Sequence, residues 1–239
     1  MISCHHTCPK CLVLAQLDID IKAMATAKNV FLYVPNLIGY LRVALSLYSL
    51  SIALIDYKIS LLCYACSFAC DYFDGLFARW LNQCSSFGAV LDMVTDRCST
   101  AGLLFILAHL YPDKRIYFLY ILLLDFSSHW MHMYSSRGHH KTGLNERNFL
   151  LRVYYGCYPL FGFCCVGSEV FYMLLYVLAF EASYKIPFTQ LPLTHLCYYV
   201  CLPACVLKNI VNLAQLLSAA NAIATEDAEM VNAKLHRIG

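Results

Sequence analysis

Four aspartates with helical spacing lie in one of the most apolar stretches of the chain. Asp71 and Asp74 are three residues apart and Asp92 and Asp96 are four apart, so each pair occupies one face of a helix. The segment between them, 80–86, reads "WLNQCSS" and predicts a tight turn that brings the two acidic faces together. Ionised carboxylates are costly in hydrocarbon unless they are compensated. Oxygen ligands favour a pair of Mg²⁺ or Mn²⁺ ions as that compensation.

Two small residues and an arginine accompany the first acid pair. A pair of divalent ions suits phosphoryl transfer, because the metals neutralise phosphate charge and align the attacking and leaving groups. Gly75 and Ala78 share the acidic face and leave a slot where a nucleotide can approach the backbone, and Arg79 offers a guanidinium to phosphate oxygens. Taken singly, each has a structural explanation, close helix packing for the small residues and snorkelling for Arg79. Beside four acids, a nucleotide site is the better interpretation.

The composition places these acids in a membrane protein. Of 239 residues, 60% are hydrophobic and only 13% are charged, which is too apolar for an ordinary soluble domain. The net charge of +2, with basic residues scattered along the chain, argues against a nucleic-acid surface, so we expect membrane lipids and small molecules as partners. Most of the 14 cysteines lie in apolar runs and are expected to be buried thiols.

Apolar windows of spanning length, about 20 residues each, predict an all-α membrane protein with six transmembrane helices at 37–56, 59–81, 87–111, 116–136, 158–180 and 192–216. Before the first window, residues 29–43 mix apolar and polar side chains around Pro35, which predicts a short N-terminal interfacial amphipathic helix that turns into the first span. Residues 1–28 are expected to be a disordered extension without a cleaved signal peptide, and Met24 is a plausible alternative start.

The distribution of basic residues predicts the orientation of the spans. The connection after the fourth span is the richest, with Arg137, Lys141, Arg147 and Arg152. The positive-inside rule then places both termini, the second and fourth connections and the tail at 223–239 in the cytosol. Because the acid pairs flank the second connection, their chemistry is expected to face the cytosol.

The acids, the small residues and the arginine together resemble a known signature. The fixed positions Asp71-x2-Asp74-Gly75-x2-Ala78-Arg79-x8-Gly88-x3-Asp92-x3-Asp96 match that of the CDP-alcohol phosphotransferase family. Further stretches, "VPNLIGYLRV" (34–43), "FGAVLDMVTDRCST" (87–100) and "LDFSSHWMHMYSS" (124–136), resemble its eukaryotic phosphatidylinositol synthase branch. The resemblance covers 29–222, which we take as one six-helix domain with the CDP-alcohol phosphotransferase fold.

The resemblance implies a reaction and roles for these residues. Family members transfer a phosphatidyl group from CDP-diacylglycerol to an alcohol, myo-inositol in this branch, and release CMP. By motif position, Asp71, Asp74 and Asp92 would be metal ligands, and Asp96 would be the general base that also reaches the second ion. A carboxylate base is chemically reasonable, because a sugar hydroxyl is a poor nucleophile at neutral pH. Gly75, Ala78 and Arg79 would form the CDP pocket. Endoplasmic reticulum residence and a homodimer are also implied.

The remaining polar candidates each allow two interpretations. Asp125, His129 and Arg152 could contact the acceptor, or they could serve interhelical hydrogen bonds and lipid headgroups. Asn36 could contact the nucleotide or cap a helix, and Arg42 could meet a lipid phosphate or snorkel. Choosing inositol therefore rests on the resemblance.

Three alternatives stay open. The first is the same reaction with choline, ethanolamine or glycerol phosphate as acceptor. The second is an intramembrane prenyltransferase, whose acid motifs are spaced differently. The third is a cation transporter, which would line a path across the bilayer with acids, whereas here they cluster beside one connection.

Overall fold

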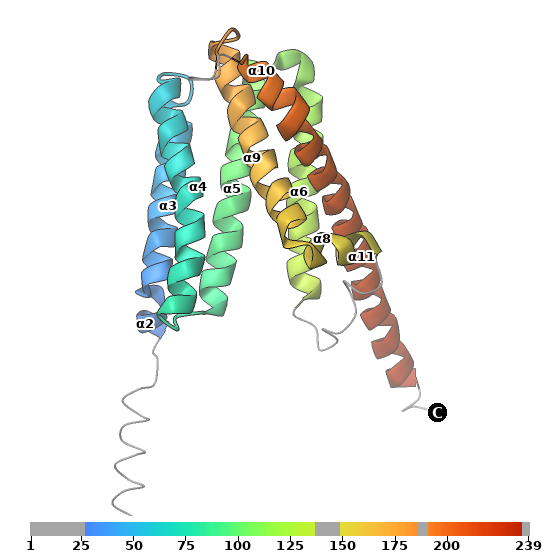
Figure 1. Cartoon of the computed structure of the whole chain (residues 1–239). Helices are drawn as coiled ribbons and strands as arrows, with labels where there is room; N and C mark the ends of the chain where they lie inside the picture. The colour runs from blue at the N-terminus through green and yellow to red at the C-terminus, as the bar shows by residue number, and fades with distance from the viewer. Residues whose placement is uncertain (1–26, 137–148, 186–190, 236–239) are drawn as a thin grey trace, which may run out of the picture.

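Helices make up the structure (Figure 1). The computed structural model describes residues 27–136, 149–185 and 191–235. These form α2 (Ala27–Phe31), α3 (Val34–Ile52), α4 (Tyr57–Trp80), α5 (Ser86–Leu110), η1 (Pro112–Lys114), α6 (Arg115–Ser135), α8 (Phe149–Gly156), α9 (Tyr158–Phe180), α10 (Leu193–His195), the π-helical turn η2 (Leu196–Cys201) and α11 (Leu202–Leu235). Within these ranges, the extended structure is limited to one isolated bridge between Lys185 and Pro192. The predicted all-α class is confirmed.

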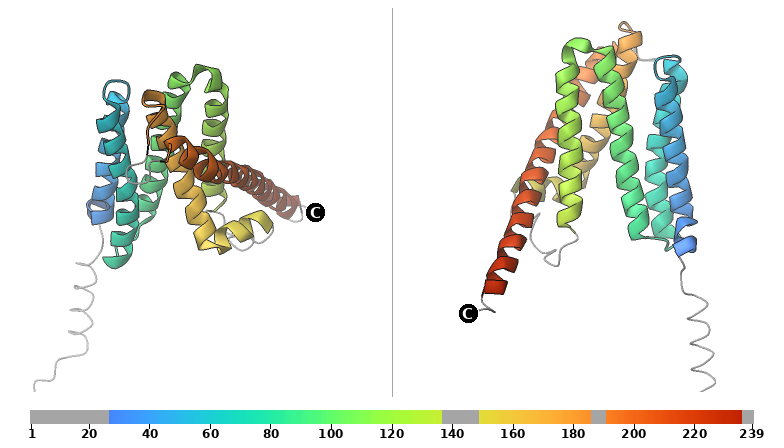
Figure 2. Two further views of the ribbon diagram at one scale, coloured as in Figure 1. Left: turned by 45° about the horizontal axis from the view of Figure 1, so that its top comes forward. Right: turned by 180° about the vertical axis from the view of Figure 1, so that it is seen from behind.

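The long helices form two flanks that share α5. Helices α3 and α4 pack along one side of the molecule and α6, α9 and α11 along the other, while α5 contacts α3, α6 and α9. The flanks meet at one end and spread apart toward the other, as the view from behind also shows (Figure 2). Helix α2, the α4–α5 connection and the C-terminal end of α11 all lie at the spread end (Figure 1). The alternation of helix direction therefore returns the chain to the end where α2 begins.

Three of the helices combine the length and the hydropathy that a membrane crossing requires. Within the described ranges these are Tyr57–Trp80, Tyr158–Phe180 and the continuous helical stretch Leu193–Leu235. The other long helices, α3, α5 and α6, carry charged residues inside their apolar runs, which lowers their mean hydropathy. All six long helices nevertheless begin and end within a few residues of the predicted windows, apart from α11, which continues through the predicted tail as far as Leu235.

The N-terminal helix differs from the interfacial helix expected over 29–43. Helix α2 has only 5 residues, and the chain is already in α3 from Val34 onward. Pro35 lies in the first turn of α3, where its missing N–H would have no intrahelical partner anyway. Pro35 thus opens the long helix instead of interrupting a short one. The predicted extension up to residue 26 lies outside the described residues.

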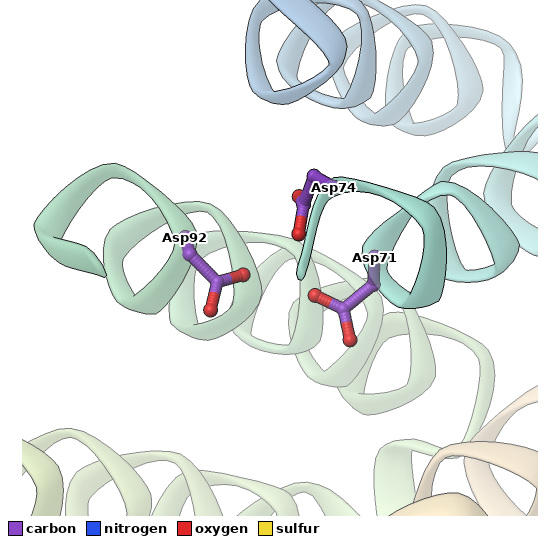
Figure 3. Close-up of side chains that lie close together, drawn as sticks. All are labelled: Asp71, Asp74 and Asp92. Carbon is purple, nitrogen blue, oxygen red and sulfur yellow. The ribbon is translucent and has the colours of Figure 1, made fainter. Parts of the chain in front are cut away.

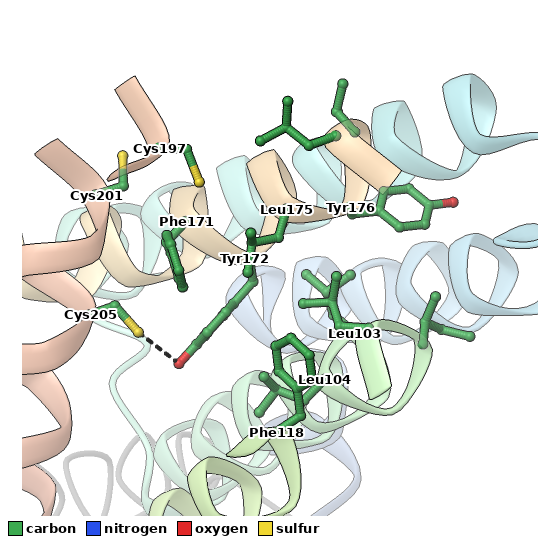
Figure 4. Packing of buried hydrophobic residues seen from close by; sticks show 14 of the residues in the cluster. Leu103, Leu104, Phe118, Phe171, Tyr172, Leu175, Tyr176, Cys197, Cys201 and Cys205 are labelled. Atoms are coloured by element: carbon green, nitrogen blue, oxygen red, sulfur yellow. Dashed lines mark hydrogen bonds between the residues drawn. The ribbon is translucent and has the colours of Figure 1, made fainter. Parts of the chain in front are cut away.

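The apolar core fills the end of the molecule where the flanks meet. Leu103 and Leu104 of α5 pack with Phe118 of α6 and with Phe171 and Leu175 of α9 (Figure 4). The buried thiols of α11 and the turn before it complete this cluster. The described cysteines are all free, as expected, but only Cys164, Cys197, Cys201 and Cys205 among them are buried. Because packing is concentrated here, the spread end is left for polar side chains and cavities.

Candidate active site

The α4–α5 hairpin is held by local sequence features. Asn82 has a φ of 54°, in the left-handed region that asparagine tolerates better than most residues. The Ser85 hydroxyl accepts a hydrogen bond from the Gly88 N–H at 3.0 Å and caps the start of α5. The Gln83 side-chain oxygen accepts the Val34 N–H at 2.9 Å, which ties the connection to the start of α3. The predicted tight turn and antiparallel helix pair are therefore present.

The hairpin brings the carboxylates together as the spacing predicted. Asp71 and Asp74 from α4 point toward Asp92 from α5 (Figure 3). Each of these three offers an oxygen, and the three oxygens lie within 4.8 Å of one another. Asp96 lies one turn further along α5 and is outside this group of three. The cluster thus divides into a converging triad and a neighbouring fourth acid.

Arg42 lies at the centre of the four acids. One terminal nitrogen is 2.6 Å from Asp74 and 2.7 Å from Asp92, and the other is 2.6 Å from Asp71 and 2.5 Å from Asp96. Its exposed fraction is 2%, so snorkelling, one of the two alternatives predicted for this arginine, does not occur. Helix α3 therefore supplies the countercharge that makes a buried acid cluster tolerable.

The donor set of the triad fits a hard divalent cation. Three carboxylates converge, and one guanidinium cannot balance the charge of four acids. Oxygen-only donors at close range match the preference of Mg²⁺ and Mn²⁺ rather than that of softer metals. Asp71, Asp74 and Asp92 are consequently the residues of this site that could hold a metal ion.

A small cavity lies on one side of the cluster. It has a volume of about 180 Å³, and its lining includes every residue predicted for the CDP pocket, Asn36, Gly75, Ala78 and Arg79. Asp74 and Asp92 also line it, so the pocket opens onto the triad. The sequence motif thus assembles one continuous surface of small residues and acids.

The small cavity depends on glycines where helices approach closely. A Cβ on Gly88 would lie 2.8 Å from the Asn36 Oδ1, closer than real contacts allow. Asn36 is buried, and its amide nitrogen donates to the Val30 carbonyl at 2.5 Å, so it bridges α2 and α3 rather than capping α3. At Gly75, a Cβ would meet only the Arg79 guanidinium, at 3.6 Å. Gly88 is therefore required by packing, whereas Gly75 leaves space in the small cavity because it has no side chain.

A larger cavity lies on the other side of the cluster. It has a volume of about 620 Å³ and is lined by Asp71, Asp92 and Asp96 together with residues of α6, α9 and α11. Asp92 lines both cavities, so the acids stand at their junction. A group held in the small cavity and a group entering from the large one would meet at the carboxylates.

Of the acceptor candidates from the sequence, Asp125 and His129 lie together, with the His129 Nδ1 3.6 Å from an Asp125 carboxylate oxygen, whereas Arg152 is on α8. Asp125 lines the larger cavity, but both of its carboxylate oxygens lie 2.9 Å from an Arg97 nitrogen, and one also accepts from the Asn212 amide at 3.0 Å. His129 lies on the same helix, with its Nδ1 2.8 Å from the Asp125 main-chain carbonyl. Arg152 is exposed on α8, above the Phe149 ring. Of the three, only Asp125 lines the larger cavity.

Three charged residues of the larger cavity were not predicted from the sequence. Arg97 joins Asp125 to Asp96, Glu169 accepts hydrogen bonds from Tyr64 at 3.0 Å and Thr100 at 2.5 Å, and Lys208 lines the wall formed by α11. Glu169 and Lys208 were detectable, because each is an isolated charge inside an otherwise apolar spanning window, and such residues are functional candidates by default.

These features define a helical membrane protein with an acidic site between two cavities. The chain belongs to the CDP-alcohol phosphatidyltransferase family, whose model matches residues 32–226. The family resemblance predicted from the motif is thereby confirmed.

Curated relatives of similar length support this membership. The chain is 40% identical over 219 residues to the CDP-diacylglycerol–inositol 3-phosphatidyltransferase of Schizosaccharomyces pombe, covering 84% of this chain and 92% of the relative. It is 40% identical over 205 residues to the Homo sapiens protein of the same name, covering 84% and 95%. A probable CDP-diacylglycerol–inositol 3-phosphatidyltransferase 2 of Arabidopsis thaliana is 38% identical over 216 residues, covering 86% and 96%. No solved structure matches the chain.

Proposed function

We propose that this protein synthesises phosphatidylinositol by transferring the phosphatidyl group of CDP-diacylglycerol to myo-inositol with release of CMP. The observation that carries the proposal is the acidic cluster at the junction of two cavities, with the complete set of predicted CDP residues lining the smaller one. The names of the relatives support inositol as the acceptor.

The small cavity would receive the nucleotide side of the donor. Gly75 and Ala78 keep the α4 surface low enough for the cytidine and its diphosphate to approach the backbone. Arg79, at the exposed rim, is suited to donate hydrogen bonds to phosphate oxygens. The acyl chains of the donor would remain in the surrounding lipid, which accounts for a site built among apolar helices.

Asp71, Asp74 and Asp92 would hold Mg²⁺ or Mn²⁺, as a pair of ions with Asp96 contributing to the second. When bound, these ions would neutralise the diphosphate and make CMP a good leaving group. The three acids come from two helices that are joined by a short connection and that both pack against α3, so α3 and the connection together set their relative positions. Arg42 would then keep contact with those acid oxygens that the ions leave free.

Asp96 would act as the general base. It lines the larger cavity, from which the acceptor would enter, and it stands beside the converging triad. A carboxylate in this position can take the proton of a hydroxyl as that oxygen attacks the β-phosphorus. The attack would run from the larger cavity toward the smaller one, in line with the departing CMP, and it needs no covalent enzyme intermediate.

The protein would cross the membrane of the endoplasmic reticulum six times. The six long helices have 19 to 34 residues, and about 17 to 25 suffice for a span. The three helices with low hydropathy are those that carry Arg42, the α5 acids and Asp125, as expected where a site is built inside the bilayer boundary. Both termini and the acids would face the cytosol, and the family resemblance suggests a homodimer.

One experiment tests the proposed function. The purified full-length protein in detergent with Mn²⁺ would be given CDP-diacylglycerol and, in parallel, myo-inositol, serine, glycerol 3-phosphate or no acceptor, and CMP release would be measured. We expect release that requires inositol. Release that requires another alcohol would overturn the acceptor assignment, and no release with any acceptor would overturn the reaction.

A further inference from the structure

Lys208 is a buried cation of α11. Its exposed fraction is 9%, and it lines the larger cavity from α11. Among the described residues, no hydrogen bond or ion pair engages its ammonium group. Burying a charged group without compensation is costly, so a residue of this kind is expected to have a ligand in the cavity that it lines.

Two amides stand beside Lys208 with free acceptor atoms. The side-chain oxygens of Asn209 and Asn212 are buried and have no hydrogen-bond partner in the described ranges. Their nitrogens are already engaged, since Asn209 donates to the Cys205 carbonyl at 2.8 Å and Asn212 donates to Asp125 at 3.0 Å. Because these donors fix which end of each amide is which, the free atoms are oxygens. Helix α11 thus supplies one lysine and two amides with unpartnered oxygens to the lining of the same cavity.

The other cations of the cavity are already neutralised. Arg42 contacts four carboxylates, and Arg97 contacts Asp125 and Asp96. Lys208 is therefore the cation of the described lining that forms no ion pair at contact distance. A phosphorylated alcohol would bring about two negative charges, which one lysine without a free arginine beside it would balance only in part. An uncharged polyol instead needs donors and acceptors in the same wall, which is what α11 provides.

We propose that Lys208, Asn209 and Asn212 bind the hydroxyl groups of the acceptor, and that they select an uncharged polyol over a phosphorylated alcohol. The inference rests on the proposed function, since it concerns the acceptor of that reaction. It replaces the expectation that Asp125, His129 and Arg152 bind the acceptor. Asp125 becomes a positioning residue that holds the Asn212 amide through its nitrogen.

The test measures the effect of each variant on the binding of the two substrates separately, in the full-length protein. For wild type and Lys208→Met, the KM values for myo-inositol and for CDP-diacylglycerol would each be measured with the other substrate saturating. We expect the inositol KM to rise at least about tenfold, since a lost hydrogen bond to a charged group is worth roughly 1.5–3 kcal/mol. The KM for CDP-diacylglycerol should stay within about twofold. Lys208→Arg, which keeps a cationic donor, should recover part of the loss.

Two further variants control for a structural effect. Lys58→Met removes a lysine whose side chain is 74% exposed, and it should leave both KM values unchanged. Asn209→Ala removes one acceptor without touching a charge and should raise the inositol KM alone. A higher KM for CDP-diacylglycerol with an unchanged inositol KM in Lys208→Met would assign Lys208 to the lipid phosphate and overturn the proposal, as would unchanged values for both.

The wild-type measurement keeps this inference separate from the proposed function. If wild type releases CMP only with another uncharged alcohol, the acceptor assignment fails, but the KM for that alcohol still tests the α11 residues. If wild type prefers glycerol 3-phosphate, the selection of an uncharged polyol is overturned directly.

Discussion

Burial and charge at single residues explain how the apolar chain tolerates its acids. Asp74 has an exposed fraction of 8% and Arg42 of 2%, so this contact is among the most enclosed of the cluster. The side chains of Asp71, Asp92 and Asp96 remain 31% to 45% exposed toward the cavities. Arg42 thus holds all four acids, and three of them are also accessible from the cavities.

Asp96 offers the sharpest test at the level of one side chain. Replacing Asp96 by Asn keeps the size of the side chain but removes the proton acceptor. We expect kcat to fall by about 10²–10⁴-fold, the usual contribution of a positioned base, with the KM for CDP-diacylglycerol little changed. Steady-state CMP release under inositol saturation measures both quantities. Undiminished turnover would remove Asp96 from the role of base.

Asp74 tests the metal assignment separately. Asp74→Asn removes one anionic ligand from the triad, so the Mn²⁺ concentration for half-maximal activity should rise by about 10- to 100-fold. Titrating CMP release with Mn²⁺ gives this concentration directly. Asp113→Asn is the matched control, because Asp113 is an exposed acid at the far end of α5. An unchanged Mn²⁺ dependence in Asp74→Asn would contradict its role as a ligand.

At the scale of elements, the α4–α5 hairpin and the start of α3 form one unit. Gly88 permits the close approach of these helices, because a Cβ there would press on Asn36 and on the Ser85 hydroxyl, at 2.8 and 3.1 Å. Gly88→Ala should therefore destabilise the protein by about 1–3 kcal/mol and raise the KM for CDP-diacylglycerol, since the small cavity lies at this contact. Thermal unfolding in detergent and steady-state kinetics measure the two effects.

A second glycine supplies the control. An added Cβ at Gly156 would meet nothing within 4 Å. Gly156→Ala should therefore leave the thermal stability and the KM for CDP-diacylglycerol near those of wild type. If Gly88→Ala and Gly156→Ala had the same thermal stability and the same KM for CDP-diacylglycerol, Gly88 would not be needed for packing against Asn36.

The elements also show what the sequence could predict. The acid hairpin was predictable because its helices are adjacent in the chain and its spacing follows the helical period. The position of Arg42 was not, because it depends on how α3 packs against both acid helices. Nor was the α11 wall, since Lys208 lines the same cavity as Asp125 and Glu169 only because helices distant in the sequence pack together. The break at Pro35 was misread because a proline can either interrupt a helix or open one.

For the whole molecule, the charged network holds the two flanks around the larger cavity. Glu169 of α9 accepts hydrogen bonds from Tyr64 of α4 and Thr100 of α5, and Arg97 of α5 pairs with Asp125 of α6. These contacts stand between the apolar core and the acids, so the flanks stay joined there while they separate toward the spread end (Figure 2). A cavity large enough for an acceptor can therefore open without loss of the fold.

The same arrangement predicts opposite exposure for the two ends of α5. Cys84 lies exposed in the α4–α5 connection, and Asp113 lies exposed beyond the other end of α5. In a background without other cysteines, Cys84 should react with a membrane-impermeant maleimide in sealed endoplasmic reticulum microsomes. An Asp113→Cys variant that also lacks Cys84 should react only after the vesicles are opened by detergent. The reversed pattern would place the acids in the lumen, and labelling of both without detergent would mean that α5 does not cross the bilayer.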